Sequence, residues 1–507
     1  MTDSRLPCLA DIDAVVFDIG DTLVHAARPG TAVDSLTVDV RPQVLDDLRD
    51  LADRGVRLAA VTDTSVMHEA DVRALLEPAG VSALLEVVVT SCDVGATKPD
   101  PLSLVTCLER LGVAPTRALY IGDRVIDRAA ADAAGTHFAF IDDTVAHTID
   151  RWEAAGPGTF AAAVAGWSPD ARRAEGARAD ALARMDALAK PPGSLGRLEA
   201  LAAQLAAIAG TCPPPLPSPA AVAVFAGDHG VHASGVTAWP QEITAAMVGM
   251  MAEGRATVNA LASAVGASVL VVDVGVATPL PGLDHRSARR VRAGTRDLSV
   301  EPAMTLAETM AALDVGTAVA NELIDDGARC LVTGEMGIAN TTPAAALIAA
   351  LTGRPPVEVA GRGAGADDAT LARKTAAIEA GLQRHSSDDH PLEVLASLGG
   401  FEIAAMAGLV IGAVTRAVPV VIDGVIANAA LLVAERLVPG VAARAIAGHR
   451  SAEPAATIAI EALGMHALLD LDMRLGEGTG AVLALPLLEA AVRALTDVAT
   501  IADLQSG

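Results

Sequence analysis

The stretch "ARCLVTGEMGIANTTPAAALIAAL", residues 328–351, joins a short apolar run, a glycine-bearing loop and a longer alanine-rich run. A short apolar run bounded by glycine is typical of a buried strand, and the alanine-rich run is typical of a helix. Thr342 followed by Pro343 predicts the helix start, because Thr is a favoured N-cap and Pro suits the first helical position. The order strand, loop, helix predicts one unit of a parallel α/β sheet.

Other stretches of the chain follow the same plan. Apolar runs that end in a glycine-bearing loop lie at residues 220–230, 267–276, 355–363 and 417–425. We expect each run to be a strand followed by a helix, in an open, doubly wound or similar sheet. Ligands of such sheets normally lie beyond the carboxyl ends of the strands. Helical sequence at 176–210, interrupted by proline and glycine, precedes these strands.

A second parallel sheet is predicted nearer the N-terminus. Its apolar runs are "DAVVFDIGDTLV" (13–24), "VRLAAVTDTS" (56–65) and "RALYIGDRVID" (117–127), with helical sequence between them. The regular pattern weakens between residues 144 and 178, where proline, glycine and small residues accumulate. We therefore predict two α/β domains, at residues 1–166 and 175–507.

The composition limits the class of partner. Of 507 residues, 52% are hydrophobic but only 2% are aromatic, so the cores must be built mainly from Ala, Val, Leu and Ile. The formal net charge is -25 and no dense run of Lys or Arg is present, which argues against nucleic-acid binding. An anionic substrate must then be held by backbone N–H groups and a few well-placed cations.

Cysteine usage and hydropathy predict a cytoplasmic protein. The cysteines are scattered and form no C-x-x-C pair, as expected in a reducing compartment without disulfides. They are Cys8, Cys92, Cys107, Cys212 and Cys330. The first residues lack the basic and apolar regions of a signal peptide. The most apolar stretch, 403–415, is too short to span a bilayer, so we expect no membrane partner.

Five residues of the N-terminal domain form a set that suits phosphoryl transfer. They are Asp18, Thr62, Lys98, Asp123 and Asp127. A carboxylate can attack phosphorus, a hydroxyl and an ammonium group can hold the phosphoryl oxygens, and acidic residues can hold Mg²⁺. The ordered set resembles the haloacid-dehalogenase-like hydrolase superfamily over residues 10–150. The resemblance implies a Rossmann-like domain with Asp18 as nucleophile, and with Asp18 and Asp123 as Mg²⁺ ligands.

One position departs from the usual pattern of that superfamily. Its phosphatases carry a second Asp two residues after the nucleophile, as acid and base for the leaving group, but this chain has Gly20 there. Asp21 follows and is expected to point elsewhere. Two interpretations therefore stay open. The domain is either an active phosphatase with an open site for a large phosphate ester, or a non-catalytic interaction module.

Glycine-bearing loops in the larger domain predict an anion site. The loop at 333–342 can direct backbone N–H groups at an anion, and the following helix adds partial positive charge. Residues 360–374 repeat the plan, with Lys374 about two turns into the helix. Such loops are also often only turns. His229 is more typical of a structural histidine than of a zinc ligand. The loop at 448–454 either faces a substrate or only connects two elements.

Eight motifs in unbroken order extend this interpretation. They are "KPPGSLGRLE", "GDHGV", "GEMGIANTT", "GRGAG", "LGGFEIAAMAG", "DGVIANAA", "GHRSAEPA" and "LDMRLGEGTGA". Together they make residues 178–507 resemble the nicotinate-nucleotide–dimethylbenzimidazole phosphoribosyltransferase family. The resemblance implies a large parallel-sheet α/β domain with a small helical subdomain, a homodimer, small-molecule substrates and no cofactor. It also implies transfer of the phosphoribosyl group of nicotinate mononucleotide to dimethylbenzimidazole, during assembly of the cobalamin nucleotide loop.

In that family the Glu of "RLGEGTGA" is the catalytic base, which in this chain is Glu477. A carboxylate suits the reaction, because the cationic pyridinium leaves without a proton donor while the attacking benzimidazole must lose its N–H proton. Flanking glycines allow an aromatic ring to approach closely. From the residues alone, Glu477 would instead cap a helix beginning near Ala481. The resemblance further implies that Glu335 supports the base.

The resemblance also implies which residues contact the substrates. Met336 and Leu475 would line a slot for a flat ring, with Gln241 near it. The residues expected to hold phosphate and ribose are Gly337, Asn340, Thr341, Thr342, Lys374, Asp423 and Gly424. The family commonly has glycine at the position of Ala339, so a positive φ there would be strained. The sequence leaves open which ring is preferred, and a nucleotide-binding protein without transfer activity remains the alternative.

Overall fold

The computed structural model describes residues 8–25, 36–154, 160–168, 170–386 and 389–506. The chain divides into two units, Met1–Pro157 and Gly158–Gly507. Helix α7 (Phe160–Ala165) packs against α12 (Leu306–Asp325) and α17 (Phe401–Thr415), so it belongs to the second unit. Both predicted parallel α/β sheets are confirmed.

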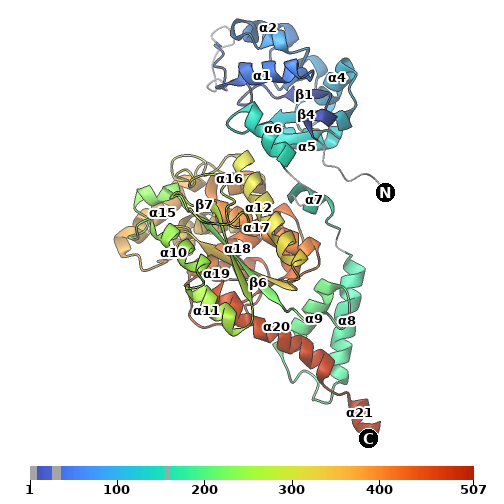
Figure 1. Cartoon of the computed structure of the whole chain (residues 1–507), viewed down its shortest axis with the longest axis vertical. Coiled ribbons are helices and arrows are strands. Elements are labelled where there is room, and N and C mark those ends of the chain that lie inside the picture. The colour runs from blue at the N-terminus through green and yellow to red at the C-terminus, as the bar shows by residue number, and fades with distance from the viewer. Residues whose placement is uncertain (1–7, 26–35, 155–159, 169, 387–388, 507) are drawn as a thin grey trace. The chain divides into compact units, whose positions relative to one another are not determined.

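The first unit is built on a five-stranded parallel sheet in the order β3-β2-β1-β4-β5. Figure 1 labels its strands β1 and β4, with helices around them. The strands are β1 (Ala14–Phe17), β2 (Arg57–Thr62), β3 (Val87–Thr90), β4 (Ala118–Gly122) and β5 (His137–Phe140). The helices are α1 (Val44–Asp53), α2 (Glu69–Leu76), α3 (Ser91–Val94), α4 (Leu102–Leu111), α5 (Val125–Ala134) and α6 (Val145–Ala154). The short strands β3 and β5 are missing from the prediction.

The second unit contains a parallel sheet in the order β10-β9-β8-β6-β7. Its strands are β6 (Ala220–Gly227), β7 (Ser268–Gly275), β8 (Cys330–Met336), β9 (Val420–Ile422) and β10 (Ala445–Ala447). The predicted strand at 355–363 is wrong, because this segment forms the short helix α14 (Pro356–Val359). Its two prolines have no N–H to donate to a strand ladder. The short edge strand β10 is missing from the prediction.

Helices cover the sheet of the second unit. The remaining ones between β6 and α20 are α10 (Ile243–Ala252), α11 (Thr257–Ala264), α13 (Thr341–Thr352), α15 (Asp368–Leu382), α16 (Pro391–Leu398), α18 (Val425–Leu437) and α19 (Pro454–Ala462). Helix α17 packs on β6 and β8, and all of its residues from 401 to 414 are buried. The most apolar stretch of the sequence is therefore a core helix.

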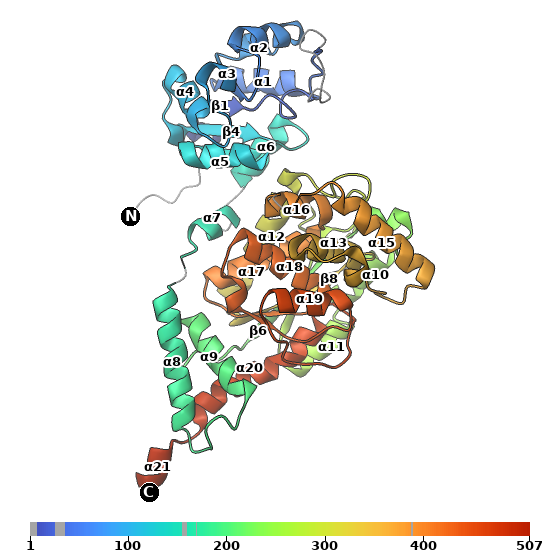
Figure 2. The same cartoon turned by 180° about the vertical axis from the view of Figure 1, so that it is seen from behind.

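The predicted helical subdomain consists of α8 (Ala171–Ala187), α9 (Arg197–Ala209) and part of α20 (Thr479–Asp497), which pack on one another (Figure 2). The final helix is α21 (Ile501–Ser506). Within the described residues, α20 alone is long and apolar enough to cross a membrane by length and composition. Its residues Ala484, Leu488 and Val492 are nevertheless buried in the core.

Candidate active sites

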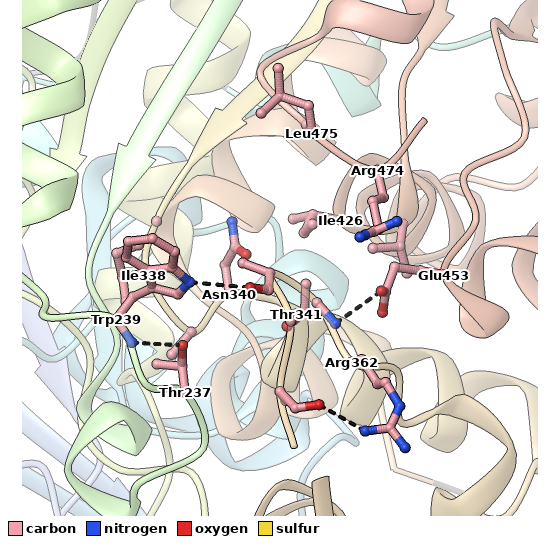
Figure 3. Close-up of a pocket in the computed structure, with 18 of the residues that line it drawn as sticks. Thr237, Trp239, Ile338, Asn340, Thr341, Arg362, Ile426, Glu453, Arg474 and Leu475 are labelled. Carbon is pink, nitrogen blue, oxygen red and sulfur yellow. Dashed lines mark hydrogen bonds between the residues drawn. The ribbon is translucent and has the colours of Figure 1, made fainter. Parts of the chain in front are cut away.

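A pocket in the second unit lies at the carboxyl end of its sheet (Figure 3). Its walls come from the loops after β6, β8, β9 and β10 and from the turn before α20, and its empty volume is about 1020 Å³, including space open to solvent. Parallel strands bring their carboxyl ends to one edge, where such sheets bind ligands. Seven predicted site residues line this pocket: Glu335, Met336, Gly337, Asn340, Thr341, Lys374 and Leu475.

The loop between β8 and α13 forms one wall. The helix begins at Thr341 with Asn340 as its N-cap residue, so the predicted N-cap at Thr342 is wrong by two positions. The reason is a turn at Ala339, whose carbonyl accepts a hydrogen bond from the N–H of Thr342 at 3.0 Å. Ala339 has a φ of 78°, which is strained for an L side chain. Asn340 instead donates a side-chain hydrogen bond to Glu335.

Lys374 of α15 reaches the pocket from the opposite side of that loop. Its ammonium group donates to two neutral oxygens, Thr341 Oγ1 at 2.6 Å and the carbonyl of Gly361 at 3.0 Å. The residue is only 2% exposed, and burial lowers the pKa of its ammonium group to about 8, although Glu453 opposes this shift. A buried cation held by neutral groups gains most from an added anion. Lys374 is therefore the cation best placed to hold a phosphate.

Glu335 at the end of β8 is the buried acid of the pocket. Burial, followed by repulsion from Asp423 and Glu402, raises the pKa of its carboxyl to about 8, against the hydrogen bond from Asn340. A carboxylate with this pKa binds a proton strongly near neutral pH. Glu335 is therefore equipped for proton transfer at the pocket surface.

Glu477 lies in a turn of three residues with positive φ. The values are 86° at Gly476, 64° at Glu477 and 88° at Gly478. This conformation is unfavourable for a non-glycine residue, and such strain gathers at functional sites. Glu477 is 4% exposed, and its Oε2 accepts a hydrogen bond from the backbone N–H of Val258 at 3.3 Å. Burial raises the pKa of its carboxyl.

The carboxylate of Glu477 therefore contacts the first turn of α11. Gly476 lines the pocket, whereas Glu477 is not among the lining residues. The alternative in which Glu477 caps the helix that follows it is wrong, since the N-cap of α20 is Gly478. Glu477 still acts on the pocket electrically, because its charge helps to raise the pKa of Glu335.

Four of the predicted contacts lie outside the lining of the pocket: Gln241, Thr342, Asp423 and Gly424. Asp423 accepts hydrogen bonds from the N–H groups of Gly478 at 3.2 Å and Ala481 at 2.9 Å. It also lies 3.2 Å from His449. Asp423 thus anchors the turn that carries Glu477.

Sequence reasoning missed several residues of this pocket. Trp239, Arg362, Glu453 and Arg474 surround its mouth (Figure 3). Trp239 Nε1 donates to the carbonyl of Ala364 at 3.2 Å, which ties two walls together. A tryptophan within a glycine-bearing polar segment, in a chain with only 2% aromatics, was a signal that could have been used.

Two histidines of the sequence motifs, His449 and His229, lie in different environments. His449, in the 448–454 loop, lines the pocket together with Ser451 and Glu453, so that loop faces the pocket. His229 is buried behind the pocket wall, with Nε2 at 3.0 Å from Glu402 Oε1. Although burial lowers it, Glu402 raises the pKa of His229 above its ordinary value.

The first unit holds the second cluster of buried charges. Asp18 follows β1, and the ammonium group of Lys98 donates to Asp18 and, at 2.6 Å, to Asp127 Oδ1. Tyr120 also donates to Asp127, at 3.0 Å. Burial raises the pKa of Asp18 to about 6, while the two carboxylates raise the pKa of Lys98 despite its burial. The structure thus brings the predicted nucleophile, lysine and later acid together.

Asp123 completes this cluster and is suited to a cation. Burial, then repulsion from Asp18 and Asp127, raises the pKa of its carboxyl to about 7, and its buried Oδ1 has no hydrogen-bond partner among the residues that the structure describes. The described residues contain no group of three His, Cys, Asp or Glu side chains arranged as metal ligands. Mg²⁺ commonly binds through one or two carboxylates and several waters, so Asp18 and Asp123 fit such an ion.

Two further positions of the first unit matter to its chemistry. Thr62 ends β2, at the same sheet edge as Asp18. At Gly20 an ideal Cβ would meet only Asp18 Oδ2, at 3.9 Å. The backbone therefore has room for the side chain that phosphatases of the resembled superfamily carry there.

A pocket at the carboxyl edge of a parallel sheet, with a buried lysine and buried carboxylates, has the position and the polar groups of a ligand site in an α/β protein. Residues 171–505 match the family model described as phosphoribosyltransferase. Residues 21–141 match the model described as haloacid dehalogenase-like hydrolase. These two matches correspond to the two units of the structure.

Individual relatives agree with the first match. Proteins named nicotinate-nucleotide–dimethylbenzimidazole phosphoribosyltransferase from Salinispora tropica and Mycobacterium marinum are 53% and 49% identical, each over 64% of this chain and over 94% and 91% of their own lengths. The crystal structure of CobT from Thermus thermophilus has a TM-score of 0.63 and 46% identity, covering 65% of this chain and 98% of that one. The chain belongs to the phosphoribosyltransferase family and carries an N-terminal haloacid dehalogenase-like unit.

Proposed function

We propose that the second unit transfers the phosphoribosyl group of nicotinate mononucleotide to 5,6-dimethylbenzimidazole. The products are α-ribazole 5′-phosphate, for the nucleotide loop of cobalamin, and nicotinate. The printed names of the relatives support this pair of substrates. The observation that carries the proposal is the buried Lys374, held by neutral oxygens in the wall of a pocket that also contains Glu335.

The proposal assigns the phosphate to the Lys374 side of the pocket. Lys374 supplies charge-assisted hydrogen bonds, and Thr341 lies at the start of α13, whose N-terminus favours an anion; Gly337 lies in the loop before that helix. Thr342, Gly424 and Asp423 complete the predicted phosphate and ribose contacts. Of these, Asp423 acts through the turn that it anchors.

Proton removal is assigned to the two buried glutamates. As the benzimidazole nitrogen attacks the ribose carbon, its ring becomes cationic and the second N–H becomes acidic. Glu477 accepts this proton, and Glu335 beside it supports the base. Glu477 must then exchange its contact with the N–H of Val258 for the ring N–H. Met336, Leu475 and Gln241 position the flat ring.

A product assay on the full chain tests this proposal. Incubation with nicotinate mononucleotide and dimethylbenzimidazole should release nicotinate and α-ribazole 5′-phosphate in equal amounts, measured by liquid chromatography with mass spectrometry. Parallel reactions with other benzimidazoles, purines and phenols would rank the acceptor rings. Binding of nicotinate mononucleotide without release of nicotinate with any ring would leave only a nucleotide-binding protein.

For the first unit we propose a phosphatase that removes the 5′-phosphate made by the second unit. Asp18 is the nucleophile, Thr62 and Lys98 hold the phosphoryl oxygens, and Asp127 orients Lys98. Asp18 and Asp123 would hold Mg²⁺, which supplies charge neutralisation of the phosphoryl group. The alternative is a non-catalytic interaction module, and Gly20 favours it.

The Asp18→Asn variant of the full chain distinguishes these alternatives. With Mg²⁺ and α-ribazole 5′-phosphate, the wild-type chain should release phosphate and the variant should release none. Gly20→Asp should raise the release, since the site has space for an acid and base there. No release by either the wild type or Gly20→Asp would leave the interaction module.

The proposal also covers the location, the oligomeric state and the partners of the enzyme. We infer a cytoplasmic homodimer that acts on small molecules, without nucleic-acid or membrane partners. The acidic composition supports the absence of nucleic-acid partners, and the names of the relatives support small-molecule substrates. Light scattering after size-exclusion chromatography should give twice the chain mass of 51.2 kDa.

A further inference from the structure

A thiol, an imidazole and a carboxylate lie in line on the first unit, outside the acidic cluster of Asp18. His68 Nδ1 is 2.7 Å from Asp93 Oδ1, and His68 Nε2 is 3.6 Å from Cys92 Sγ. A carboxylate that accepts from Nδ1–H leaves Nε2 as the lone-pair nitrogen of the neutral ring. The imidazole is thus oriented to accept the proton of the thiol, as the base does in nucleophilic triads.

Each member of this group is open to reagents. Cys92 is half-buried, and the side chains of His68 and Asp93 are 60% and 22% exposed. Asp93 also accepts hydrogen bonds from the N–H of Glu69 at 2.9 Å and the hydroxyl of Thr90 at 2.8 Å. These bonds fix the carboxylate that orients the ring. They do not account for the second ring nitrogen, which faces the sulfur.

We propose that Cys92 is a nucleophilic thiol, with His68 as its base and Asp93 as the residue that orients His68, and that it forms mixed disulfides with small disulfides. The thiol transfers its proton to His68 Nε2 while its sulfur attacks one sulfur of the small disulfide. The S–S bond of the reagent breaks, and the departing thiolate takes the bonding electron pair and then the proton from His68. Cys92 is oxidised and half of the reagent is reduced to a thiol.

The other cysteines provide contrasts within the same molecule. Cys8 is exposed, but its thiol donates to a carboxylate, Asp11 Oδ2, at 3.3 Å. Cys212 is half-buried like Cys92, and burial raises the pKa of its thiol. Cys107 and Cys330 are buried. If exposure alone set reactivity, Cys8 would react first.

The site adjoins the loop that follows Thr62. The residue before Cys92 is Ser91, whose hydroxyl donates to the carbonyl of Thr64 and accepts from its N–H, both at 2.9 Å. A disulfide adduct on Cys92 would therefore lie next to the segment that links β2 to α2. The proposal for the thiol does not depend on phosphatase activity in this unit.

Site-resolved labelling of the full chain tests the proposal. Native protein is treated at pH 7 with a limiting amount of iodoacetamide and, separately, with oxidised glutathione, and each cysteine peptide is quantified by mass spectrometry. Cys92 should be alkylated at least about three times as fast as Cys8, and its rate should exceed that of Cys212 by a larger factor. It should also be the main site of the mixed disulfide. Alkylation of Cys92 no faster than Cys8 would overturn the proposal without any variant.

Two variants then test whether His68 and Asp93 cause the reactivity of the Cys92 thiol. His68→Gln should reduce Cys92 labelling to the rate of Cys8 or below, while the rates of Cys8 and Cys212 stay unchanged. Asp93→Asn keeps an oxygen for the cap of α2 but favours the wrong ring tautomer, so it should also slow Cys92. Unchanged labelling in a folded His68→Gln protein, checked by its thermal transition, would overturn the role of His68 as the base.

Discussion

The two units each bury one functional lysine, and the two lysines are in opposite electrostatic states. Lys98 contacts the carboxylates of Asp18 and Asp127, which raise its pKa despite burial. Lys374 contacts a hydroxyl and a carbonyl, and burial lowers its pKa to about 8. The first charge is neutralised by its own site, whereas the second lacks a contacting counter-ion among the described residues. A phosphate therefore gains more at Lys374, while at Lys98 it must compete with two carboxylates.

The largest effect is expected at Glu477, an acid that takes no part in the proposed binding of the phosphate. Glu477→Gln should lower the transfer rate about 10²–10⁴-fold, because it removes the proposed proton acceptor. The affinity for nicotinate mononucleotide, measured by calorimetry, should stay the same, since Lys374 is intact. Glu335→Gln is the matched control, and a larger loss there than at Glu477 would move the role of the base to Glu335.

In the first unit, Lys98→Gln tests the comparison between the two buried lysines. Removing the cation leaves Asp18 and Asp127 buried without their partner, so unfolding of this unit should become easier by about 3 kcal/mol. Chemical denaturation followed through Tyr120 and Trp152 fluorescence would measure the change. A stability equal to that of the wild type would show that the carboxylates do not depend on Lys98.

Lys374→Gln should have the opposite profile. It should raise the KM for nicotinate mononucleotide about 10- to 100-fold, the effect of losing a charge-assisted hydrogen bond, and leave folding nearly unchanged. Steady-state kinetics on the second unit's reaction would measure it. A KM within twofold of the wild type would place the phosphate elsewhere, with Arg362 and Arg474 as the other cations of the pocket.

The smallest effect concerns the loop beside Lys374. Ala339 has a positive φ, so Ala339→Gly should stabilise the second unit by about 1 kcal/mol through relief of strain. The thermal unfolding midpoint should rise, and the KM should change little. A lower midpoint would mean that the methyl group contributes packing that outweighs the strain.

The sequence predicted those features that depend on local patterns. Continuous apolar runs identified β6 and β8, and the glycine-bearing loop after β8 indicated the pocket wall. The helix α14 was mistaken for a strand because a segment of four residues is too short to show the period of either element. Local patterns also identified the five residues of the first unit, four of which the structure joins in one cluster.

Long-range features could not be predicted in this way. The direction of the Glu477 side chain depends on the N–H of Val258, which is 219 positions away in the chain. The contacts of Arg474 and Glu453 with the pocket depend on how two separate loops meet at the sheet edge. No period or spacing carries that information, because only the packing of the sheet sets it.

The central claim is that the ammonium group of Lys374 is incompletely protonated in the free protein and binds an anion. A pKa of about 8 makes it about one-tenth protonated at pH 9, and a bound phosphate should raise that pKa, so binding should take up about 0.9 proton. Calorimetric titration of nicotinate mononucleotide at pH 9, in two buffers with different ionisation enthalpies, measures this uptake directly. The account predicts the uptake in the wild type and its loss in Lys374→Gln. Binding of equal strength without proton uptake in the wild type would contradict it.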